Sequence, residues 1–134
     1  VNHPPHYAEH PSGVECIDVT KHMPFCLGNC FKYIFRAGSK LSEIEDYKKA
    51  LWYLDAAPEG TLYEIKPIKT AAIPSTLPAT LITEIIIGEP SNVKREMFGC
   101  FIRTNLGLLK EILTKRISEL EEMVPPPSKS AYHT

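Results

Sequence analysis

Proline limits what this chain can fold into more than any other residue does. Its ring fixes φ and removes the backbone donor, so proline rarely lies inside a helix or a central strand. The chain has 12 prolines among 134 residues, nearly twice the usual share of about 5%. We expect them to mark boundaries: Pro24 separates two helical stretches, Pro58 closes the N-terminal half, and three prolines at 125–127 begin the tail.

The segment after Pro24 predicts an amphipathic helix over Phe25–Ala37. Apolar side chains recur there with the i, i+3, i+4, i+7, i+8 spacing of one helix face. These side chains are Leu27, Cys30, Phe31, Ile34 and Phe35. Gly38 follows at the position where glycine commonly ends a helix. A shorter helical stretch is expected before Pro24, beginning near Val14.

A third helix is expected between Ser42 and Pro58. Ser42 and Glu45 have the spacing of a capping box, in which each side chain bonds a free backbone N–H at the helix start. The apolar face of this helix consists of Ile44, Tyr47, Leu51 and Leu54. Residues 14–58 are therefore predicted to form three short helices.

The pattern changes after Gly60. Leu62–Lys66 alternates like a strand, Leu81–Ile87 is rich in β-branched residues, and Met97–Arg103 is a third strand candidate. A long amphipathic helix is expected over 105–123, where leucine and isoleucine recur at helical spacing.

The predicted fold class is therefore α+β. It consists of an N-terminal three-helix segment, a small three-strand β unit and a long C-terminal amphipathic helix. We expect residues 1–59 to form one helical domain. Residues 60–123 would form a β-β-β-α unit that packs on this domain or serves oligomerisation, and residues 124–134 a disordered tail.

Charge and composition exclude several classes of protein. The formal net charge is −1, which argues against binding nucleic acid or an anionic membrane by bulk charge. No apolar stretch is long enough to span a bilayer, and residues 1–6 lack a signal-peptide pattern. The four cysteines contain no CxxC pair, so we expect reduced thiols in a cytoplasmic protein.

Two polar helix faces are the candidate site. One face lies opposite the apolar stripe of the helix over 25–37 and consists of Asn29, Lys32, Tyr33 and Arg36. Lys40 follows just after this helix. The third helix offers Asp46, Lys49 and Tyr53 at i, i+3 and i+7. Such donors suit an anion, phosphate above all. If the two helices form an antiparallel hairpin, Arg36 and Asp46 lie near its turn and can pair. The alternative is a polar face that is merely solvated.

Other chemistries have weaker support. His3, His6, His10, His22 and Cys16 are metal-ligand types, but their spacing fits no standard site, and we expect no metal there. The chain has no Walker-type phosphate loop. The helix over 25–37 carries no carboxylate, which weakens a magnesium site shared with Glu45 and its neighbours.

Four motifs occur in a specific order over residues 2–55. They are Asn-His-Pro-Pro-His-Tyr at 2–7, Glu-Cys-Ile-Asp at 15–18, the Gly-Asn, Lys-Tyr and Arg-Ala-Gly groups between 28 and 38, and Glu-Asp with Lys-Lys-Ala and Trp-Tyr-Leu between 45 and 54. In this order the segment resembles a small phage-encoded family of nucleotide kinase-like proteins, long catalogued as a domain of unknown function. Residues 61–123 do not match that family's kinase-like member.

The resemblance implies a deoxynucleoside monophosphate kinase without a Walker loop. It further implies ATP as phosphate donor, possible use of magnesium, a homo-oligomer, and the cytoplasm of an infected bacterial cell. Lys32, Arg36 and Asp46 would be catalytic: the two cations would hold phosphate oxygens, and Asp46 would orient Arg36 or Lys49. The ligand-binding residues would be His6, Tyr7, Asn29, Tyr33, Lys40, Lys49 and Tyr53.

Two alternatives stay open at this stage. In the first, the chain binds a nucleotide without turning it over, for example to sequester a cyclic or ADP-ribose-type signal of bacterial immunity. Alternatively, the strands and the helix over 105–123 drive assembly, and the polar faces are interfaces of a structural oligomer.

Overall fold

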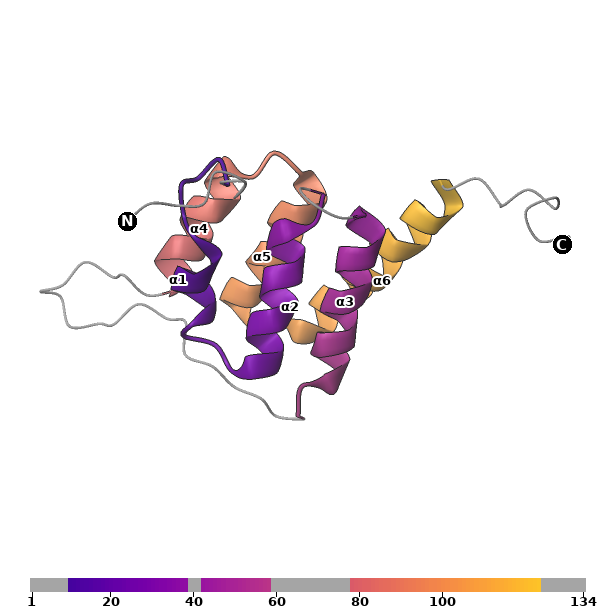
Figure 1. Cartoon of the computed structure of the whole chain (residues 1–134), viewed down its shortest axis with the longest axis horizontal. Helices are drawn as coiled ribbons and strands as arrows, with labels where there is room; N and C mark the ends of the chain where they lie inside the picture. The colour runs from indigo at the N-terminus through magenta and orange to yellow at the C-terminus, as the bar shows by residue number, and fades with distance from the viewer. Residues whose placement is uncertain (1–9, 39–41, 59–77, 124–134) are drawn as a thin grey trace, which may run out of the picture.

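The structure is a computed structural model that describes residues 10–38, 42–58 and 78–123. Within these ranges the chain forms six helices and no strand (Figure 1). They are α1 (Cys16–Thr20), α2 (Phe25–Arg36), α3 (Glu43–Ala56), α4 (Pro78–Gly88), α5 (Asn92–Arg103) and α6 (Leu106–Met123).

The helices form two layers that follow chain order. Helices α1, α2 and α3 pack side by side in the front layer of Figure 1, and α4, α5 and α6 form the layer behind them. Contacts between the layers join α1 to α4, α2 to α5 and α3 to α6. The polar faces of α2 and α3 are therefore left on the outer side of the front layer.

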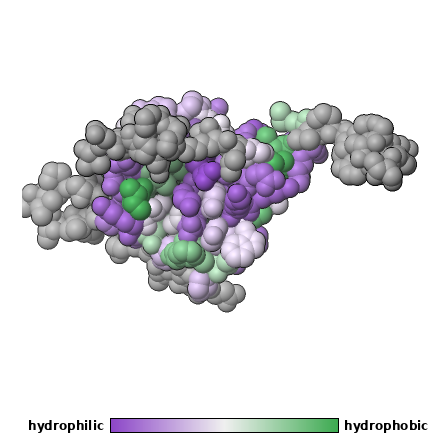
Figure 2. Space-filling model, viewed as in Figure 1, coloured by the Kyte–Doolittle hydropathy of each residue, from purple (hydrophilic) through white to green (hydrophobic). Residues whose placement is uncertain are grey.

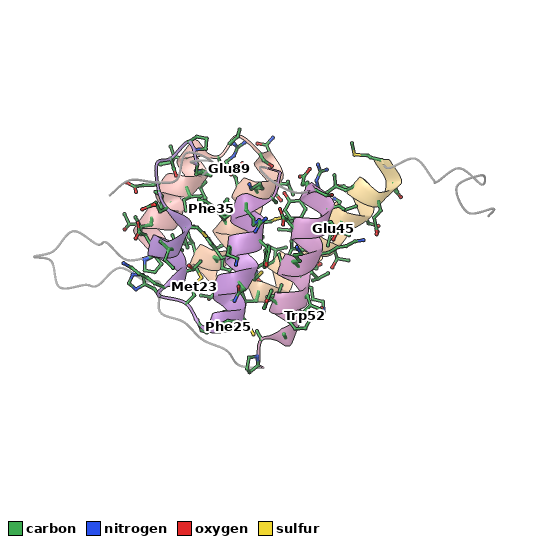
Figure 3. The ribbon with its side chains drawn as sticks, in the orientation of Figure 1. Met23, Phe25, Phe35, Glu45, Trp52 and Glu89 are labelled. Carbon is green, nitrogen blue, oxygen red and sulfur yellow. The ribbon has the colours of Figure 1, made fainter. Side chains whose placement is uncertain are left out.

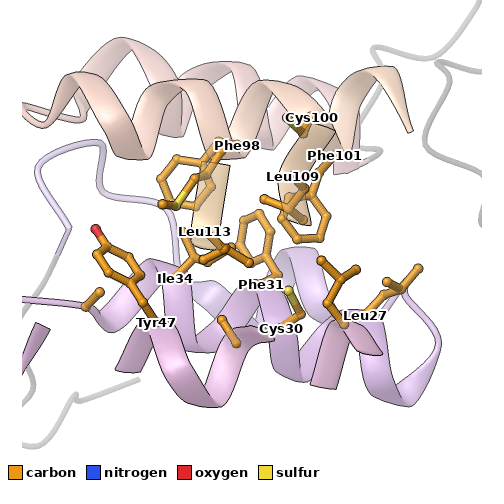
Figure 4. Close-up of a cluster of buried hydrophobic side chains, with 14 of the residues drawn as sticks. Leu27, Cys30, Phe31, Ile34, Tyr47, Phe98, Cys100, Phe101, Leu109 and Leu113 are labelled. Atoms are coloured by element: carbon orange, nitrogen blue, oxygen red, sulfur yellow. The ribbon is translucent and has the colours of Figure 1, made fainter. Parts of the chain in front are cut away.

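One buried cluster fills the space between the layers (Figure 4). At its centre the Phe31 ring lies 5.2 Å from that of Phe98 and 5.1 Å from that of Phe101, centroid to centroid. Leu109 and Leu113 of α6 join them, and all five side chains are fully buried. Helices from both sides of residue 60 thus share one core, while the domain division proposed at residue 59 stays a prediction.

The predicted strand over Leu81–Ile87 is wrong, because these residues lie within α4. The segment buries Ala79, Ile82 and Ile85 at three-residue spacing, which is the period of a helix and not of a strand. A short run of β-branched residues cannot be told from a buried helix by hydrophobicity alone. Helix α4 packs against both α1 and α5, and this packing selects the helical period.

The predicted strand over Met97–Arg103 is also wrong, because it lies within α5. Buried residues recur at Lys94, Met97, Phe98 and Phe101, the spacing of a helix face. Ser91 begins the helix by accepting a hydrogen bond at Oγ from the Lys94 amide, at 3.3 Å. Both the cap and the spacing were visible in the sequence, and they outweigh the strand pattern.

The α+β class is therefore corrected to all-helical for the part of the chain that the structure describes. The remaining strand candidate, Leu62–Lys66, and the predicted disordered tail over 124–134 lie outside the described residues. The three N-terminal helices and the long C-terminal helix are confirmed as elements.

Two details at the α2–α3 connection test the sequence signals. Gly38 has a φ of +87°, so the expected glycine stop is confirmed. Ser42 occupies the N-cap position of α3, but its side chain makes no capping hydrogen bond. The predicted capping box is therefore wrong in its hydrogen bonds, although α3 begins where it was expected.

Candidate functional site

A stack of two tyrosines joins the polar faces of α2 and α3. The Tyr33 and Tyr53 rings lie 5.9 Å apart with an interplanar angle of 11°. Both side chains are half-buried, because α2 and α3 run antiparallel and bring the two rings together on their shared outer side. Stacked rings of this kind form a rigid platform with little side-chain entropy left to lose.

Three cations surround the Tyr33 ring. The Lys32 Nζ lies 5.0 Å from its centroid, the Lys49 Nζ 5.5 Å and the Arg36 Cζ 5.6 Å. Lys32 and Lys49 form no ion pair with any carboxylate among the described residues. The ring face attracts the cations, so two positive charges without an ion-pair partner among the described residues gather beside Arg36.

The opposite end of this face is aromatic. The Tyr53 ring contacts Trp52 at 5.1 Å and Phe25 at 6.1 Å, both edge to face. Trp52 is 66% exposed and Phe25 75% exposed, and Figure 3 shows both at the same end of the α2–α3 pair. Figure 2 shows hydrophilic residues over the middle of this side of the molecule. The site thus runs from cations, through two stacked tyrosines, to exposed rings.

An ion pair lies at the turn end of the same face. Arg36 Nε is 3.6 Å from Asp46 Oδ1, and the Asp46 side chain is fully buried. No described residue donates a hydrogen bond to either carboxylate oxygen. Burial raises the pKa of Asp46, and Arg36 is the largest opposing influence. The predicted pairing of Arg36 with Asp46 is confirmed, and it holds the guanidinium over buried charge.

The remaining site predictions divide into two groups. Asn29 lies on the outer face, but its side-chain amide donates to the Phe25 carbonyl at 2.9 Å, which leaves less of it for a ligand. His6, Tyr7 and Lys40 lie outside the described residues. The structure therefore brings together Lys32, Tyr33, Arg36, Asp46, Lys49 and Tyr53.

Sequence reasoning missed a second polar cluster, buried behind the C-terminus of α2. Lys94 of α5 is 8% exposed, and its Nζ donates to the carbonyls of Phe35 and Ala37, each at 3.1 Å. Glu89, which is 4% exposed, lies 3.6 Å from that Nζ. Burial lowers the pKa of Lys94, whereas the Glu89 carboxylate opposes this shift. The only sequence signal was a lysine on the apolar stripe of α5.

His10 completes this cluster. Its Nδ1 accepts a hydrogen bond from the Ser12 amide at 3.1 Å, so the proton resides on Nε2, which donates to Glu89 Oε1 at 2.9 Å. The other Glu89 oxygen accepts from the Ser91 amide at 3.0 Å. His10 is of a metal-ligand type, but in the structure its largely buried side chain donates to Glu89.

Thiol and metal chemistry have little support at this site. All four cysteines are free, and burial raises the pKa of Cys16, which Lys32 lowers only in part, to about 12. A thiol with such a pKa is not a thiolate near neutral pH. Within residues 10–38, 42–58 and 78–123, no three His, Cys, Asp or Glu side chains are grouped to hold a metal ion.

The comparisons with known proteins find a family match over nearly the same N-terminal residues as the resemblance, but they give no activity for that family. Residues 1–55 match DUF3310, a family described as proteins of unknown function. Comparison with curated proteins and with solved structures gave no match. The family description assigns no chemistry, so kinship with nucleotide kinases stays a prediction. The matched segment contains α1, α2 and most of α3, and thus all the described site residues.

The described helices also bear on membrane insertion. None of those within the described ranges is both long and apolar enough to cross a bilayer.

Proposed function

We propose that the outer face of α2 and α3 binds a nucleotide. The observation that carries this proposal is the cluster of Lys32, Arg36 and Lys49 within 5.0–5.6 Å of one tyrosine ring that itself stacks on another. A nucleotide has an anionic phosphate at one end and a planar base at the other. The face offers the matching order, cations first and aromatic rings beyond them.

The cationic end suits phosphate oxygens. Charge-assisted hydrogen bonds from lysine and arginine are stronger than neutral ones, and a guanidinium offers a planar fork to two oxygens. Lys32 and Lys49 have no carboxylate partner among the described residues, so a phosphate would not have to displace one. Asp46 binds one side of Arg36 and keeps its guanidinium at this end.

The aromatic end suits the base. Trp52 and Phe25 are largely exposed and rest against Tyr53. Stacking of a base on an aromatic side chain contributes roughly 1–3 kcal/mol and tolerates different bases. Exposed rings beside a cationic cluster are therefore a reason to favour a nucleotide over a simple inorganic anion.

For the reaction, we propose phosphoryl transfer from ATP to a deoxynucleoside monophosphate. This part depends on the sequence resemblance. Such a transfer relies on positioning and on neutralising charge more than on covalent catalysis. Lys32 and Arg36 would neutralise the oxygens of the transferred group, while Asp46 would orient Arg36. No magnesium ligand is assigned, and a homo-oligomer is part of the same proposal.

Binding and turnover are separated by one experiment. Backbone amide spectra of the full chain are recorded during titration with each deoxynucleoside monophosphate, and the same samples are incubated with ATP and analysed by chromatography. Shifts confined to α2 and α3 with a diphosphate product support the kinase. Shifts with recovery of intact ligand support sequestration. Absence of shifts with every nucleotide would contradict the binding proposal.

A further inference from the structure

The buried cluster behind α2 touches the backbone on both sides of Arg36. Lys94 Nζ donates to the carbonyls of Phe35 and Ala37, at 3.1 Å each. These residues are the sequence neighbours of Arg36. Carbonyls at the C-terminal end of a helix receive no hydrogen bond from within the helix, so a donor from another helix can bind them and hold them in place. The ammonium also lies at the negative end of the α2 dipole.

Lys94 is itself held in place by buried partners. Glu89 Oε1 lies 3.6 Å from Lys94 Nζ and accepts from His10 Nε2 at 2.9 Å. The His10 ring lies 5.0 Å from the ring of Phe35, centroid to centroid. Figure 3 shows Glu89 and Phe35 toward the same end of the molecule. The cluster thus contacts Phe35 at its carbonyl through Lys94 and at its ring through His10.

The same charge acts on the partner of Arg36. Lys94 favours the ionised form of Asp46, after Arg36 and Lys49. Asp46 is fully buried, so it feels a nearby cation with little screening by water. Loss of Lys94 would therefore remove two hydrogen bonds to the backbone beside Arg36. It would also make the ionised form of Asp46, which pairs with Arg36, less favourable.

We infer that Lys94 is a positioning residue for Arg36, and that Glu89 and His10 hold Lys94 in the position this requires. Lys94 is buried beneath the site, where its Nζ bonds the α2 backbone. Through the two carbonyls it fixes where the Arg36 side chain leaves the helix, and thereby the anion affinity of the face. The consequence for affinity rests on the nucleotide binding proposed above, whereas the consequence for Arg36 itself does not.

The test therefore reads Arg36 directly, in the protein without ligand. Arg36 Nε is buried, so its N–H should exchange slowly with solvent and can be followed by NMR with labelled arginine. Lys94→Met keeps the length of the chain and removes the charge and both donors. We expect it to accelerate Arg36 Nε–H exchange about fivefold to thirtyfold, which is the upper part of the range for coupling through packed networks.

Two further variants keep the result interpretable. Glu89→Gln removes the charge that holds Lys94 and should shift the same exchange rate in the same direction, so it decides the matter if Lys94→Met does not fold. Ile82→Ala, in the core contact of α4, lowers stability without touching this cluster. It should leave the Arg36 exchange rate within about twofold when compared at equal fractions of folded protein.

Nucleotide titrations complete the test. Lys94→Met should weaken binding by a similar factor in the natural background, and by less than twofold when Arg36 is already Met. An unchanged Arg36 exchange rate in the folded Lys94→Met or Glu89→Gln variant would overturn the inference. If no nucleotide binds at all, the proposed function fails while the exchange rate still decides the role of Lys94.

Discussion

Arg36 and Asp46 form an ion pair across the turn between α2 and α3, with Nε and Oδ1 3.6 Å apart. The carboxylate is fully buried, while the arginine side chain is 31% exposed. A buried charge with an incomplete set of hydrogen bonds costs stability. We therefore interpret the pair as one that positions the guanidinium and lowers the free energy of unfolding.

Asp46→Asn tests that cost through its dependence on pH. Burial raises the pKa of Asp46 above the ordinary value of 3.8, so the folded state binds this proton more tightly than the unfolded state does. Ionisation of Asp46 then lowers stability as pH rises from about 3.8 to the raised pKa. Asn should be more stable than Asp above this window and lose its advantage below it.

We expect Asn to keep its stability advantage at pH 7 and to lose it as the pH falls below about 3.8, the ordinary pKa of the Asp46 carboxyl. Urea unfolding of both proteins between pH 3 and pH 8 measures it. A variant that is less stable than the natural protein at pH 7, by an amount independent of pH, would contradict this account.

Gly88→Ala should destabilise the fold through a backbone clash. A Cβ at this last residue of α4 would lie 2.8 Å from Ser12 N and 2.9 Å from Ser12 Cα, closer than such contacts allow. Separating the two segments also disturbs the turn that carries His10. We expect a loss of about 1–3 kcal/mol in the free energy of unfolding.

Gly107→Ala is the matched control, since a Cβ there meets nothing nearer than Asn105 Oδ1 at 3.9 Å. Gly107 is an exposed residue of α6, where alanine favours the helix by up to about 1 kcal/mol. Equal destabilisation by both substitutions would mean that the approach of Ser12 to α4 is not a real constraint.

Cys16 should react slowly with alkylating reagents. Burial raises its pKa to about 12, against an ordinary value of 9.0, and only the thiolate is nucleophilic. We expect its alkylation by iodoacetamide at pH 8, followed by mass spectrometry of peptides, to be at least about a hundred times slower than in the urea-unfolded chain. Labelling of Cys16 in the folded protein at pH 8 as fast as in the unfolded chain would count against the described packing of α1 on α2.

Phe31→Ala should be the most costly of these substitutions. The ring contacts Phe98 and Phe101 between the two layers, and removing it leaves a cavity that neighbouring helices cannot fill. The expected loss is about 3–5 kcal/mol, measured by urea unfolding. Phe31→Leu should lose much less, and an equal loss would indicate that ring packing does not define this core.

The N-terminal half was the more predictable part of the fold. There the proline and glycine boundaries coincide with the helix limits, and the apolar stripe containing Leu27, Phe31 and Ile34 is the buried face of α2. The strand prediction for the second half was wrong because Ile85, Ile86 and Ile87 have high strand propensity, whereas packing of α4 against α1 and α5 selects a helix. Local propensity is a weak guide when tertiary contacts oppose it.

The outer-face residues of the candidate site could be predicted from the sequence, but the buried cluster behind them could not. Helical spacing alone places Lys32 and Arg36 on one face, and an antiparallel hairpin brings Lys49 and Tyr53 beside them. Nothing local connects His10, Glu89 and Lys94, because Lys94 bonds carbonyls that lie 57 and 59 residues away in the chain. Buried polar contacts between distant segments follow from the completed fold and have no short-range pattern.

Two neighbouring lysines provide the most direct test of nucleotide binding. Lys49 lies over the Tyr33 ring, whereas Lys48 faces α6 and pairs with Glu121 at 3.1 Å. Lys48→Met and Lys49→Met change the net charge equally and are adjacent on the same helix. Only Lys49 belongs to the proposed site, so the pair separates a local phosphate contact from the effect of overall charge.

The measurement is the dissociation constant of the tightest-binding deoxynucleoside monophosphate, determined by isothermal titration calorimetry for the natural protein and both variants. We predict that Lys49→Met weakens binding about tenfold or more, as expected for loss of a hydrogen bond to a charged group, and that Lys48→Met changes it by less than twofold. Equal affinities for all three proteins, or an equal loss in both variants, would contradict a nucleotide site on the outer face of α2 and α3.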